Sequence, residues 1–345
     1  MASISVIMPV RNGVAYVRSA IDSVLSQSFS DFWFIIVDDG STDGLSDVVE
    51  SYRDDRIRFV RFEQPVGICG ALNRGIDAAE TEYIARMDAD DVCYPDRLAI
   101  QHAYMEQHPD VGLCGSWVRL FGDSEAERIR RMPTNPEWVR AYALFDNPHV
   151  HSSMLLRRSF MDRHGLRYDD AFARAEDYDL WTRAMDHFAG VNLRQVLLRY
   201  RIHEQSVTTR ALREMDAAAV RVVSRHLQKL DIPISQEDLL FHRYLGTNRL
   251  YPDRTRRTIC KAADWLHVIL DANDRTGVYD ASLLRRVVSD VWYGVCYHSL
   301  PLGSWVVAKY FTSRLTAGSP QGGATAAVFL AAAVKSFLRA GSVQR

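Results

Sequence analysis

The sequence feature that most constrains the fold is a short apolar run that ends in three carboxylates. Residues 83–91 read Tyr-Ile-Ala-Arg-Met-Asp-Ala-Asp-Asp, so that Asp88, Asp90 and Asp91 close the run. An apolar run bounded by polar turn residues is typical of a buried strand, and the acids then lie at its carboxyl end. In an open α/β sheet, this end is where ligands bind. Three acids placed there repel one another unless a cation neutralises them, and hard divalent cations are the usual partners of such oxygen ligands.

Strand and helix patterns alternate through the first hundred residues. Four apolar runs are expected to be strands: residues 4–9, 32–37, 57–62 and 83–87. Segments with helical periodicity separate them, at 14–28, around 45–49 and at 67–79. The Gly-Ser-Thr-Asp sequence at 40–43 is expected to close a turn and cap the second helix. Strand–helix alternation at this spacing predicts right-handed βαβ units and a parallel sheet.

Strand patterns continue to about residue 205 and then stop. Further strands are expected at 111–121, 153–157 and 191–200, and helices at 135–145, from 176, and from Pro95, which suits a first helical turn. Beyond residue 210, four helices are expected: 211–230, 235–250, 255–271 and 281–298. We therefore predict an α/β domain over 1–210, Rossmann-like with a mostly parallel sheet flanked by helices, and a helical region over 211–345.

Composition limits the class of protein. The net charge of −1 argues against nucleic acid as the main partner. The five cysteines form no C-x-x-C pair, so they indicate neither a zinc site nor a disulfide framework. The N-terminus does not resemble a signal peptide, and no run reaches the roughly 18 apolar residues of a membrane span. A cytoplasmic protein is expected.

The first strand is not followed by a glycine-rich phosphate loop. Neither G-x-G-x-x-G nor G-x-x-x-x-G-K-[ST] occurs there, which argues against a dinucleotide-dependent dehydrogenase and a P-loop nucleotidase. Acids take the place of the loop: Asp38 and Asp39 follow the second strand, as the three acids at 88–91 follow the fourth. An acid after the second strand can accept hydrogen bonds from a base or ribose, and the later group can hold a metal on a diphosphate. The sequence predicts a nucleotide-diphosphate site without a Walker loop.

Four blocks of this chain resemble the signature blocks of family 2 glycosyltransferases, in the order of that family. They are residues 4–12 (Ile-Ser-Val-Ile-Met-Pro-Val-Arg-Asn), 37–43 (Val-Asp-Asp-Gly-Ser-Thr-Asp), 85–91 with Pro-Asp-Arg-Leu at 95–98, and 176–181 (Glu-Asp-Tyr-Asp-Leu-Trp). The resemblance covers residues 4 to about 205. It implies a GT-A fold and an inverting transferase that uses a nucleotide-diphospho-sugar, a UDP-sugar first of all, with Mg²⁺ or Mn²⁺. Synthesis of bacterial cell-surface polysaccharide is the implied setting.

The resemblance also assigns roles to the residues of the donor site. Pro9, Arg11 and Asp39 would line the nucleotide pocket, with Asp39 facing the base. Asp88 would lie near the ribose and the metal. The family often has Arg-Asn in the helix before the metal motif, whereas this chain has Leu-Asn-Arg at 72–74. Asn73 and Arg74 are therefore donor-site candidates, and it stays open whether Arg74 makes the phosphate or base contact.

The remaining roles concern the metal and the reaction. The resemblance makes Asp90 a metal ligand and Asp177 the catalytic base. Single displacement with inversion needs one carboxylate within reach of the acceptor hydroxyl, and an acid at a helix start suits that role. His203 lies in a segment similar to the Tyr-Arg-x-His of the family, where it would reach the metal or the diphosphate. A purely structural histidine is the alternative reading.

Two other functions stay open at the level of sequence. A nucleotidyltransferase that makes a sugar nucleotide also uses acids at strand ends, although it normally has a glycine-rich loop with a following Lys or Arg. A non-catalytic nucleotide-sugar-binding protein is the second alternative, but it would need neither Asp90 nor Asp177. Release of pyrophosphate from an NTP, or donor binding without turnover, would distinguish them.

The last 55 residues carry no acid: Asp290 is the last one in the chain. They hold several cations and aromatic residues: Lys309, Arg314, Lys335, Arg339, Arg345, Trp292, Tyr293, Tyr297, Trp305, Tyr310 and Phe311. Residues 324–338 form an apolar run too short to span a bilayer. Apolar faces edged by cations suit an interfacial helix on an anionic leaflet such as the inner face of the plasma membrane. That location would suit a lipid-linked acceptor, and a glycan is the other acceptor expected. Packing within the chain, or on a second subunit in a homo-oligomer, is the alternative.

Overall fold

The computed structural model describes residues 2–122, 127–203, 212–247, 254–318 and 327–336. The chain forms two compact units, one of residues 1–139 and 147–219 and the other of residues 140–146 and 220–345. The second unit therefore includes a short segment, residues 140–146, whose neighbours in the sequence on both sides belong to the first unit. The boundary expected between residues 210 and 211 lies outside the described residues and stays a prediction.

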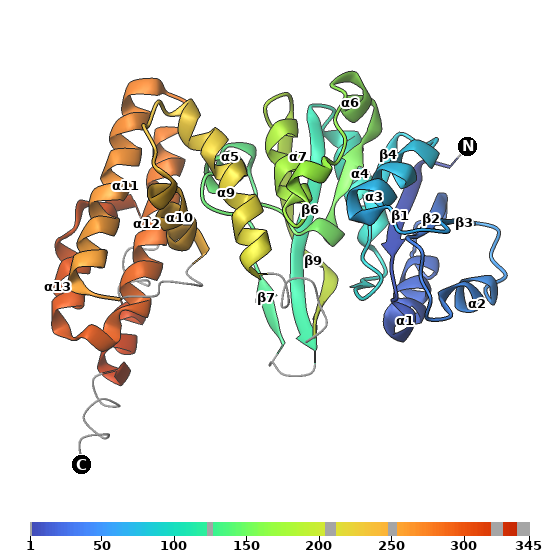
Figure 1. Cartoon of the computed structure of the whole chain (residues 1–345), viewed down its shortest axis with the longest axis horizontal. Helices are drawn as coiled ribbons and strands as arrows, with labels where there is room; N and C mark the ends of the chain where they lie inside the picture. Colours follow the sequence, from blue (N-terminus) through green and yellow to red (C-terminus); the bar gives the residue numbers. More distant parts are fainter. Residues whose placement is uncertain (1, 123–126, 204–211, 248–253, 319–326, 337–345) are drawn as a thin grey trace, which may run out of the picture. The chain divides into compact units, whose positions relative to one another are not determined.

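A nine-stranded sheet organises the described part of the first unit (Figure 1). Its order is β3-β2-β1-β4-β8-β6-β9-β5, and β7 pairs with β6. The strands are β1 Ile4–Val10, β2 Phe32–Asp38, β3 Ile57–Arg61, β4 Tyr83–Arg86, β5 Val92–Cys93, β6 Val111–Gly122, β7 Arg128–Arg130, β8 Leu155–Arg157 and β9 Ala189–Ile202. The first four are parallel, as the alternation predicts.

The helices of this unit follow the expected positions. They are α1 Val14–Leu25, α2 Leu45–Glu50, α3 Gly67–Ala78, α4 Arg97–Gln107, α5 Pro136–Tyr142, α6 Arg158–Arg163 and α7 Glu176–Ala184, with the short 3₁₀ helices η1 His151–Ser153 and η2 Asp170–Phe172. Two local predictions need correction. Helix α4 begins at Arg97, so Pro95 precedes it instead of lying in its first turn. The N-cap residue of α2 is Gly44, one position after the expected cap at 40–43. Asp43 still accepts a hydrogen bond from the Leu45 N–H at 3.3 Å, and its other oxygen accepts from the Val14 N–H at 2.8 Å, so one carboxylate bonds to the first residues of both α2 and α1.

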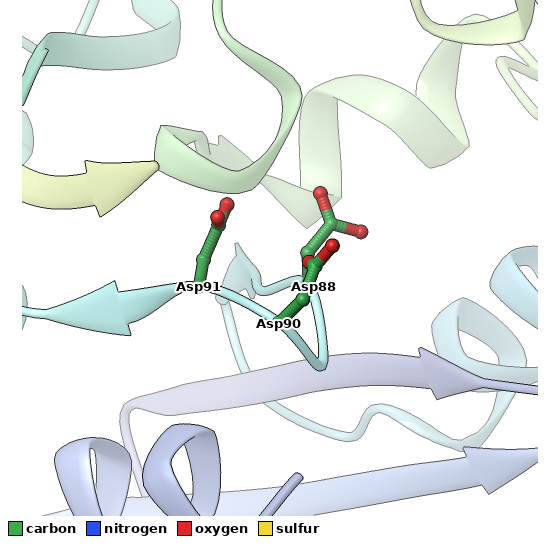
Figure 2. Close-up of side chains that lie close together, drawn as sticks. All are labelled: Asp88, Asp90 and Asp91. Carbon is green, nitrogen blue, oxygen red and sulfur yellow. The ribbon is translucent and has the colours of Figure 1, made fainter. Parts of the chain in front are cut away.

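One edge of the sheet collects most of the polar sequence blocks. Strand β8 runs antiparallel to β4 and β6, while β9 is parallel to β6. The carboxyl ends of β1, β2, β4, β6 and β9 therefore lie at the same edge, and so does the start of β8 with η1 before it. The turn after β4 contains Asp88, Asp90 and Asp91 (Figure 2). This topology brings the sequence blocks at 9–13, 38–43 and 88–91 to one edge.

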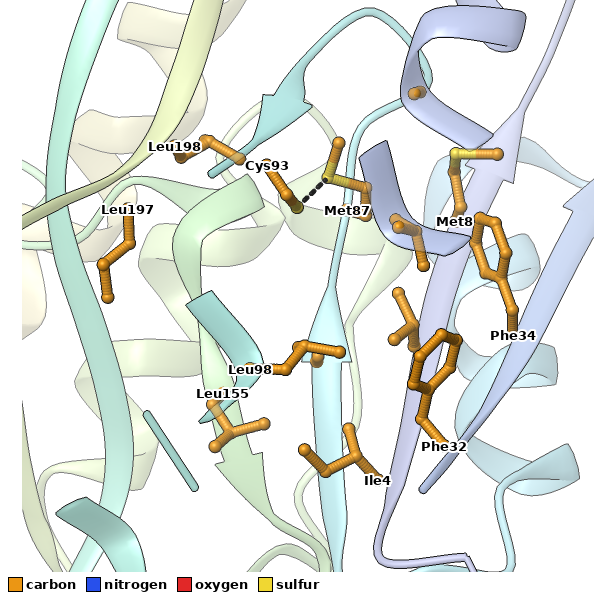
Figure 3. Close-up of a cluster of buried hydrophobic side chains, with 14 of the residues drawn as sticks. Ile4, Met8, Phe32, Phe34, Met87, Cys93, Leu98, Leu155, Leu197 and Leu198 are labelled. Atoms are coloured by element: carbon orange, nitrogen blue, oxygen red, sulfur yellow. Dashed lines mark hydrogen bonds between the residues drawn. The ribbon is translucent and has the colours of Figure 1, made fainter. Parts of the chain in front are cut away.

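The core is built from both faces of the sheet because parallel strands are covered on both sides. The cluster in Figure 3 takes alternate residues of the strands and so lies on one face, where Ile4 of β1, Phe32 of β2, Met87 just after β4 and Leu98 of α4 belong to it. Helix α1 contributes a stripe of buried residues at helical spacing, from Val17 to Val24. The apolar runs of the sequence are therefore the buried strands of the fold.

The second unit is helical in all its described parts. It contains α9 Leu212–Lys229, which begins in the first unit, then α10 Gln236–Thr247, α11 Arg256–Thr276, α12 Ala281–His298 and α13 Ser304–Thr312, with η3 Leu300–Leu302, η4 Arg314–Gly318 and a helix at 327–336. The four helices expected there are confirmed, except that α11 extends to Thr276 and residues 211 and 248–250 lie outside the described residues. Thr255 starts α11 with a capping box. None of the helices described here is both long and apolar enough to cross a bilayer.

Candidate active site

The turn between β4 and β5 brings three carboxylates together. One oxygen each from Asp88, Asp90 and Asp91 lies within 4.8 Å of the others. Figure 2 shows the three side chains pointing to the same side of the turn. The side chains of Asp88 and Asp90 are 31% and 32% exposed, whereas Asp91 is buried. The first two are therefore the accessible members of the group.

Asp91 anchors the turn to the rest of the sheet. One of its carboxylate oxygens accepts from the backbone N–H of Arg201 at 2.8 Å, and the other accepts from the hydroxyl of Ser152. These partners come from β9 and η1. Burial raises the pKa of Asp91 well above its ordinary value, and the charges of Asp88 and Asp90 add to this effect. Because both of its oxygens are already bonded, Asp91 holds the turn in place instead of offering a free ligand.

Asp88 has a buried cation beside it. It forms an ion pair with Arg86, the last residue of β4, whose side chain is only 5% exposed. Burial opposes the charge of Arg86, but the neighbouring carboxylate of Asp88 outweighs it and raises the pKa of the guanidinium. The position of Arg86 is fixed at its backbone, because Arg97 donates to the carbonyl oxygen of residue 86 at 2.8 Å.

Asp90 meets residues from the end of β9. Its carboxylate lies 3.0 Å from Nε2 of His203, and its backbone carbonyl accepts from Nε of Arg201 at 2.7 Å. The guanidinium of Arg201 lies over the rings of Tyr16 and Phe121. Burial and the charge of Asp88 raise the pKa of Asp90, and His203 opposes the rise. The expected neighbours Asp88, Asp90 and His203 thus lie in one place.

The donor set fits a divalent metal ion. Two partly exposed carboxylates, with the third close by, offer the hard oxygen ligands that Mg²⁺ and Mn²⁺ prefer. The imidazole of His203, with Nε2 3.0 Å from the Asp90 carboxylate, is a further candidate ligand. Burial, followed by the charges of neighbouring acids, raises the pKa values of Asp90 and Asp91, and a bound cation would favour their ionised forms.

The second acidic turn follows β2 at the same edge. Asp39 is buried and accepts from the backbone N–H of Val66 at 2.6 Å. Its neighbour Asp38 accepts from the N–H of Ser41 at 2.8 Å and so closes its own turn. Pro9 is buried near the end of β1, and Arg11 is exposed in the loop after it. Pro9, Arg11 and Asp39 are therefore at the strand ends where a nucleotide pocket was predicted, and their contact with a nucleotide stays a prediction.

Asn73 and Arg74 differ sharply in their surroundings. The side-chain amide of Asn73 donates to the backbone carbonyl of Tyr168 at 2.9 Å, and its oxygen accepts from the Tyr168 N–H at 3.0 Å. Arg74 is exposed at the next position of α3. Asn73 thus ties α3 to the segment before α7. Of the two donor-site candidates, Arg74 is therefore the one whose side chain is exposed and could contact a bound donor.

The Glu176–Asp177 pair begins α7. The carboxylate of Asp177 accepts from the backbone N–H of Tyr178 and from the side-chain amide of Asn147, both at 2.7 Å. Burial raises the pKa of Asp177, although these hydrogen bonds and the charge of Arg86 lower it. Burial and the charge of Asp177 raise the pKa of Glu176 to about 7. Oε2 of Glu176 is buried without a hydrogen-bond partner among the described residues.

Arg86 links this pair to the acidic turn. Its charge acts on Asp88 and also on Glu176 and Asp177 from α7. The sequence reasoning missed Arg86, together with Ser152, Asn147, Glu176 and Arg201, which position or surround the acids. A signal for Arg86 was present, since a charged residue inside an apolar strand is rarely buried unless it is paired.

Comparisons with known proteins agree with the family that these sequence blocks resemble, although the fourth block lies beyond the match to the family model. The model of Glycosyl transferase family 2 matches residues 5–165. An uncharacterized glycosyltransferase of Methanocaldococcus jannaschii is 32% identical over 208 residues, covering 58% of this chain and 70% of that protein. The O-antigen biosynthesis glycosyltransferase WbnJ of Escherichia coli is 33% identical over 225 residues, covering 63% of this chain and 86% of its own.

Solved structures agree with the fold. The crystal structure of S. aureus TarS 1–349 aligns over 92% of this chain and 90% of its own, with a TM-score of 0.55 and 18% identity. The mannosyltransferase PcManGT from Pyrobaculum calidifontis aligns over 97% of this chain and 86% of its own, with a TM-score of 0.55 and 17% identity. At these identities the structures support the fold alone, whereas the relatives with higher identity identify the family. The chain is a GT-A protein and belongs to glycosyltransferase family 2.

Proposed function

We propose that the protein is an inverting glycosyltransferase that moves a sugar from a nucleotide-diphospho-sugar to an acceptor hydroxyl with the help of Mg²⁺ or Mn²⁺. The observation that carries this proposal is the acidic turn of Asp88 and Asp90, linked through Arg86 to an ionisable acid at the start of α7. The nucleotidyltransferase alternative loses support, because the sequence relatives are glycosyltransferases.

The donor is a nucleotide-diphospho-sugar, with a UDP-sugar as the first candidate. Structures of TarS with UDP-GlcNAc and of PcManGT with GDP-Man and Mn²⁺ support a donor and a cation of these classes. Pro9, Arg11 and Asp39 would receive the nucleotide at the ends of β1 and β2, and Arg74 would reach its charged part. A bound cation would stabilise the charge of the departing diphosphate. Asp88 and Asp90 would hold that cation, and His203 would support Asp90.

Asp177 is the proposed base. To accept the proton of the acceptor hydroxyl, its carboxylate must be ionised and correctly oriented. The hydrogen bonds from Tyr178 and Asn147 stabilise the ionised form and fix its direction, and the charge of Arg86 acts in the same sense. The neighbouring Glu176, with its pKa near 7, has the opposite character and would be partly protonated at neutral pH.

The setting is proposed from the relatives. WbnJ carries O-antigen biosynthesis in its name, and AmsE of Erwinia amylovora carries amylovoran biosynthesis. We infer a role in bacterial cell-surface polysaccharide synthesis on the cytoplasmic side, with a glycan or a lipid-linked sugar as acceptor. The lipid-linked acceptor would place the enzyme at the inner face of the plasma membrane.

Donor screening followed by turnover would test the proposal. Purified protein is heated with UDP-, GDP- and dTDP-sugars, with and without Mn²⁺, since a bound donor raises apparent stability by mass action. The stabilising donor is then incubated with candidate acceptors, and release of the nucleoside diphosphate is measured. Asp177→Asn should bind the donor but lose turnover by about 10²-fold or more. Full activity of that variant would refute the assignment of the base, and pyrophosphate release from an NTP and a sugar phosphate would favour the nucleotidyltransferase.

A further inference from the structure

The last helix in the described part of the second unit is short and is apolar on its buried and on its exposed sides. In residues 327–336, drawn at the red end of the colour scale in Figure 1, Phe329 and Ala333 are buried. Phe329 stacks on Tyr310 of α13, with ring centres 4.3 Å apart. On the outer side, Val328, Leu330 and Val334 are 58%, 46% and 56% exposed. A helix that is apolar on all sides is normally buried, so its outer side is expected to contact another apolar surface.

Aromatic side chains from α12 and α13 surround the same helix. Phe311 is 43% exposed, and its ring centre lies 6.1 Å from that of Phe329. Tyr297 is also exposed, and it stacks on Tyr293, whose ring meets Phe329 edge to face. We call Tyr297, Phe311, Val328, Leu330 and Val334 the C-terminal face. Its members come from three helices of one unit, and ring contacts connect its two aromatic members to the buried Phe329, directly for Phe311 and through Tyr293 for Tyr297.

The charged residues that lie within three positions of the C-terminal face in the sequence are cations. Lys309, Arg314 and Lys335 each lie within three residues of a member of the face, and none forms an ion pair with a described residue. No acid occurs in the chain after Asp290. Asp290 of α12 is the acid whose charge acts on Tyr310 beneath the face, so the three cations outnumber it. An apolar surface with an excess of cations beside it is complementary to a surface that is apolar inside and anionic at its boundary.

We propose that the C-terminal face is an interfacial binding surface for an anionic lipid bilayer. The face would insert its aliphatic and aromatic side chains at the level of the headgroups, while the three cations meet anionic phosphates. A second copy of the chain suits the face less well. A two-fold contact would bring the same cations together across the interface, with no acid from this segment to pair with them. The proposal does not depend on the identity of the donor or the acceptor.

Vesicle co-sedimentation with the full-length protein tests the proposal. The probes are vesicles of pure phosphatidylcholine and vesicles in which about a third of the lipid is phosphatidylglycerol. We expect binding to the mixed vesicles at low salt, little binding to the neutral ones, and release at about 0.5 M NaCl, where screening is strong. Equal binding to both vesicles, or no sedimentation at low salt, would overturn the proposal.

Variants at exposed positions separate the lipid surface from other partners. Val328→Ser with Val334→Ser should weaken vesicle binding by about tenfold or more, because both apolar side chains leave the interface. Lys309→Gln and Lys335→Gln should each weaken it by about fivefold, and only on anionic vesicles. Val268→Ser on α11 is the matched control, since Val268 is also exposed but lies outside the face, and it should bind as the unchanged protein does.

Two outcomes would contradict a lipid partner directly. If light scattering finds a dimer that the Val328→Ser, Val334→Ser variant dissociates, the face is a contact between copies. If both variant sets bind the vesicles as strongly as the control does, another part of the chain binds the lipid. Circular dichroism and thermal unfolding of each variant establish that it is folded, so that a loss of binding reports on the face itself.

Discussion

The buried guanidinium of Arg86 forms an ion pair with the partly exposed carboxylate of Asp88, and its charge also acts on the Glu176–Asp177 pair at the start of α7. One cation of the protein thus serves two acidic groups that are far apart in the sequence. Asp88 belongs to the proposed metal site and Asp177 is the proposed base. The arrangement lets the two groups lie close together before any donor or metal binds.

Replacing Arg86 by Met should destabilise the protein by roughly 3–5 kcal/mol near neutral pH, because removal of the cation leaves the buried Asp177 and the partly exposed Asp88 without a compensating charge. The loss should shrink on addition of Mn²⁺, since the metal would neutralise the same acids. Chemical unfolding with and without Mn²⁺ measures both effects. The Arg86→Lys variant keeps the positive charge and should therefore lose clearly less stability than Arg86→Met. If Arg86→Met were as stable as the unchanged protein, the pairing with Asp88 would have no structural importance.

The order of strands and helices in the first unit could be predicted from the sequence because local patterns determine it. Buried parallel strands need continuous apolar runs, and the helices between them show a stripe such as that from Val17 to Val24. The acids at 38–39 and 88–91 were placed correctly at one edge, since parallel strands end on the same side. Predicting their position required only the local pattern of an apolar run followed by acids, and no knowledge of contacts between distant residues.

The remaining features depend on contacts that no local pattern records. Asn147 meets Asp177, and Ser152 meets Asp91, because β8 and η1 insert antiparallel into the sheet beside β4. The segment 140–146 joins the second unit through Arg243, which donates to Asp146 at 2.9 Å. Nothing in the sequence around residues 140–146 indicates a partner a hundred positions away. Long-range pairings of this kind decide the orientation of the site residues.

Asp90 and Asp91 should respond differently to substitution, although they are adjacent. Asp90→Ala should abolish the dependence of donor binding on Mn²⁺ while the fold stays intact, because Asp90 is partly exposed and offers a ligand. Asp91→Ala should cost about 2–4 kcal/mol of stability, since it leaves the Arg201 N–H and the Ser152 hydroxyl without their acceptor. Calorimetric titration of the donor, with Mn²⁺ or with EDTA, and thermal unfolding separate the two effects. Equal donor affinity in Mn²⁺ and in EDTA for the unchanged protein would refute the metal site.

Glu176 should make the stability of the metal-free protein fall as the pH rises. Its pKa in the folded protein is about 7, above its ordinary value of 4.5, mainly because burial disfavours the ionised form. The native state therefore binds more protons than the unfolded chain between these two values, and the free energy of unfolding decreases across that window.

Glu176→Gln should remove this dependence. Near pH 8, the variant should be more stable than the unchanged protein by on the order of 2–3 kcal/mol, since a neutral amide replaces a buried carboxylate. Well below pH 4.5, where Glu176 is protonated in both the folded and the unfolded state, the advantage should largely disappear. Thermal unfolding of both proteins across this range measures the difference. An equal difference at both ends would mean that Glu176 does not titrate as its burial implies.

Substitutions of Asn73 and Arg74, which are adjacent on α3, should have different effects: the first on stability and the second on donor binding. Asn73→Ala removes two hydrogen bonds to the buried backbone of Tyr168 and should cost about 2–4 kcal/mol of stability. Arg74→Ala should change stability by no more than about 0.5 kcal/mol, because Arg74 is exposed. It should weaken donor binding by about tenfold or more if its guanidinium contacts the diphosphate. Urea unfolding and donor titration of both variants provide the comparison, in which each protein is the control for the other. If Arg74→Ala bound the donor normally and a correctly folded Asn73→Ala did not, the contact would belong to Asn73.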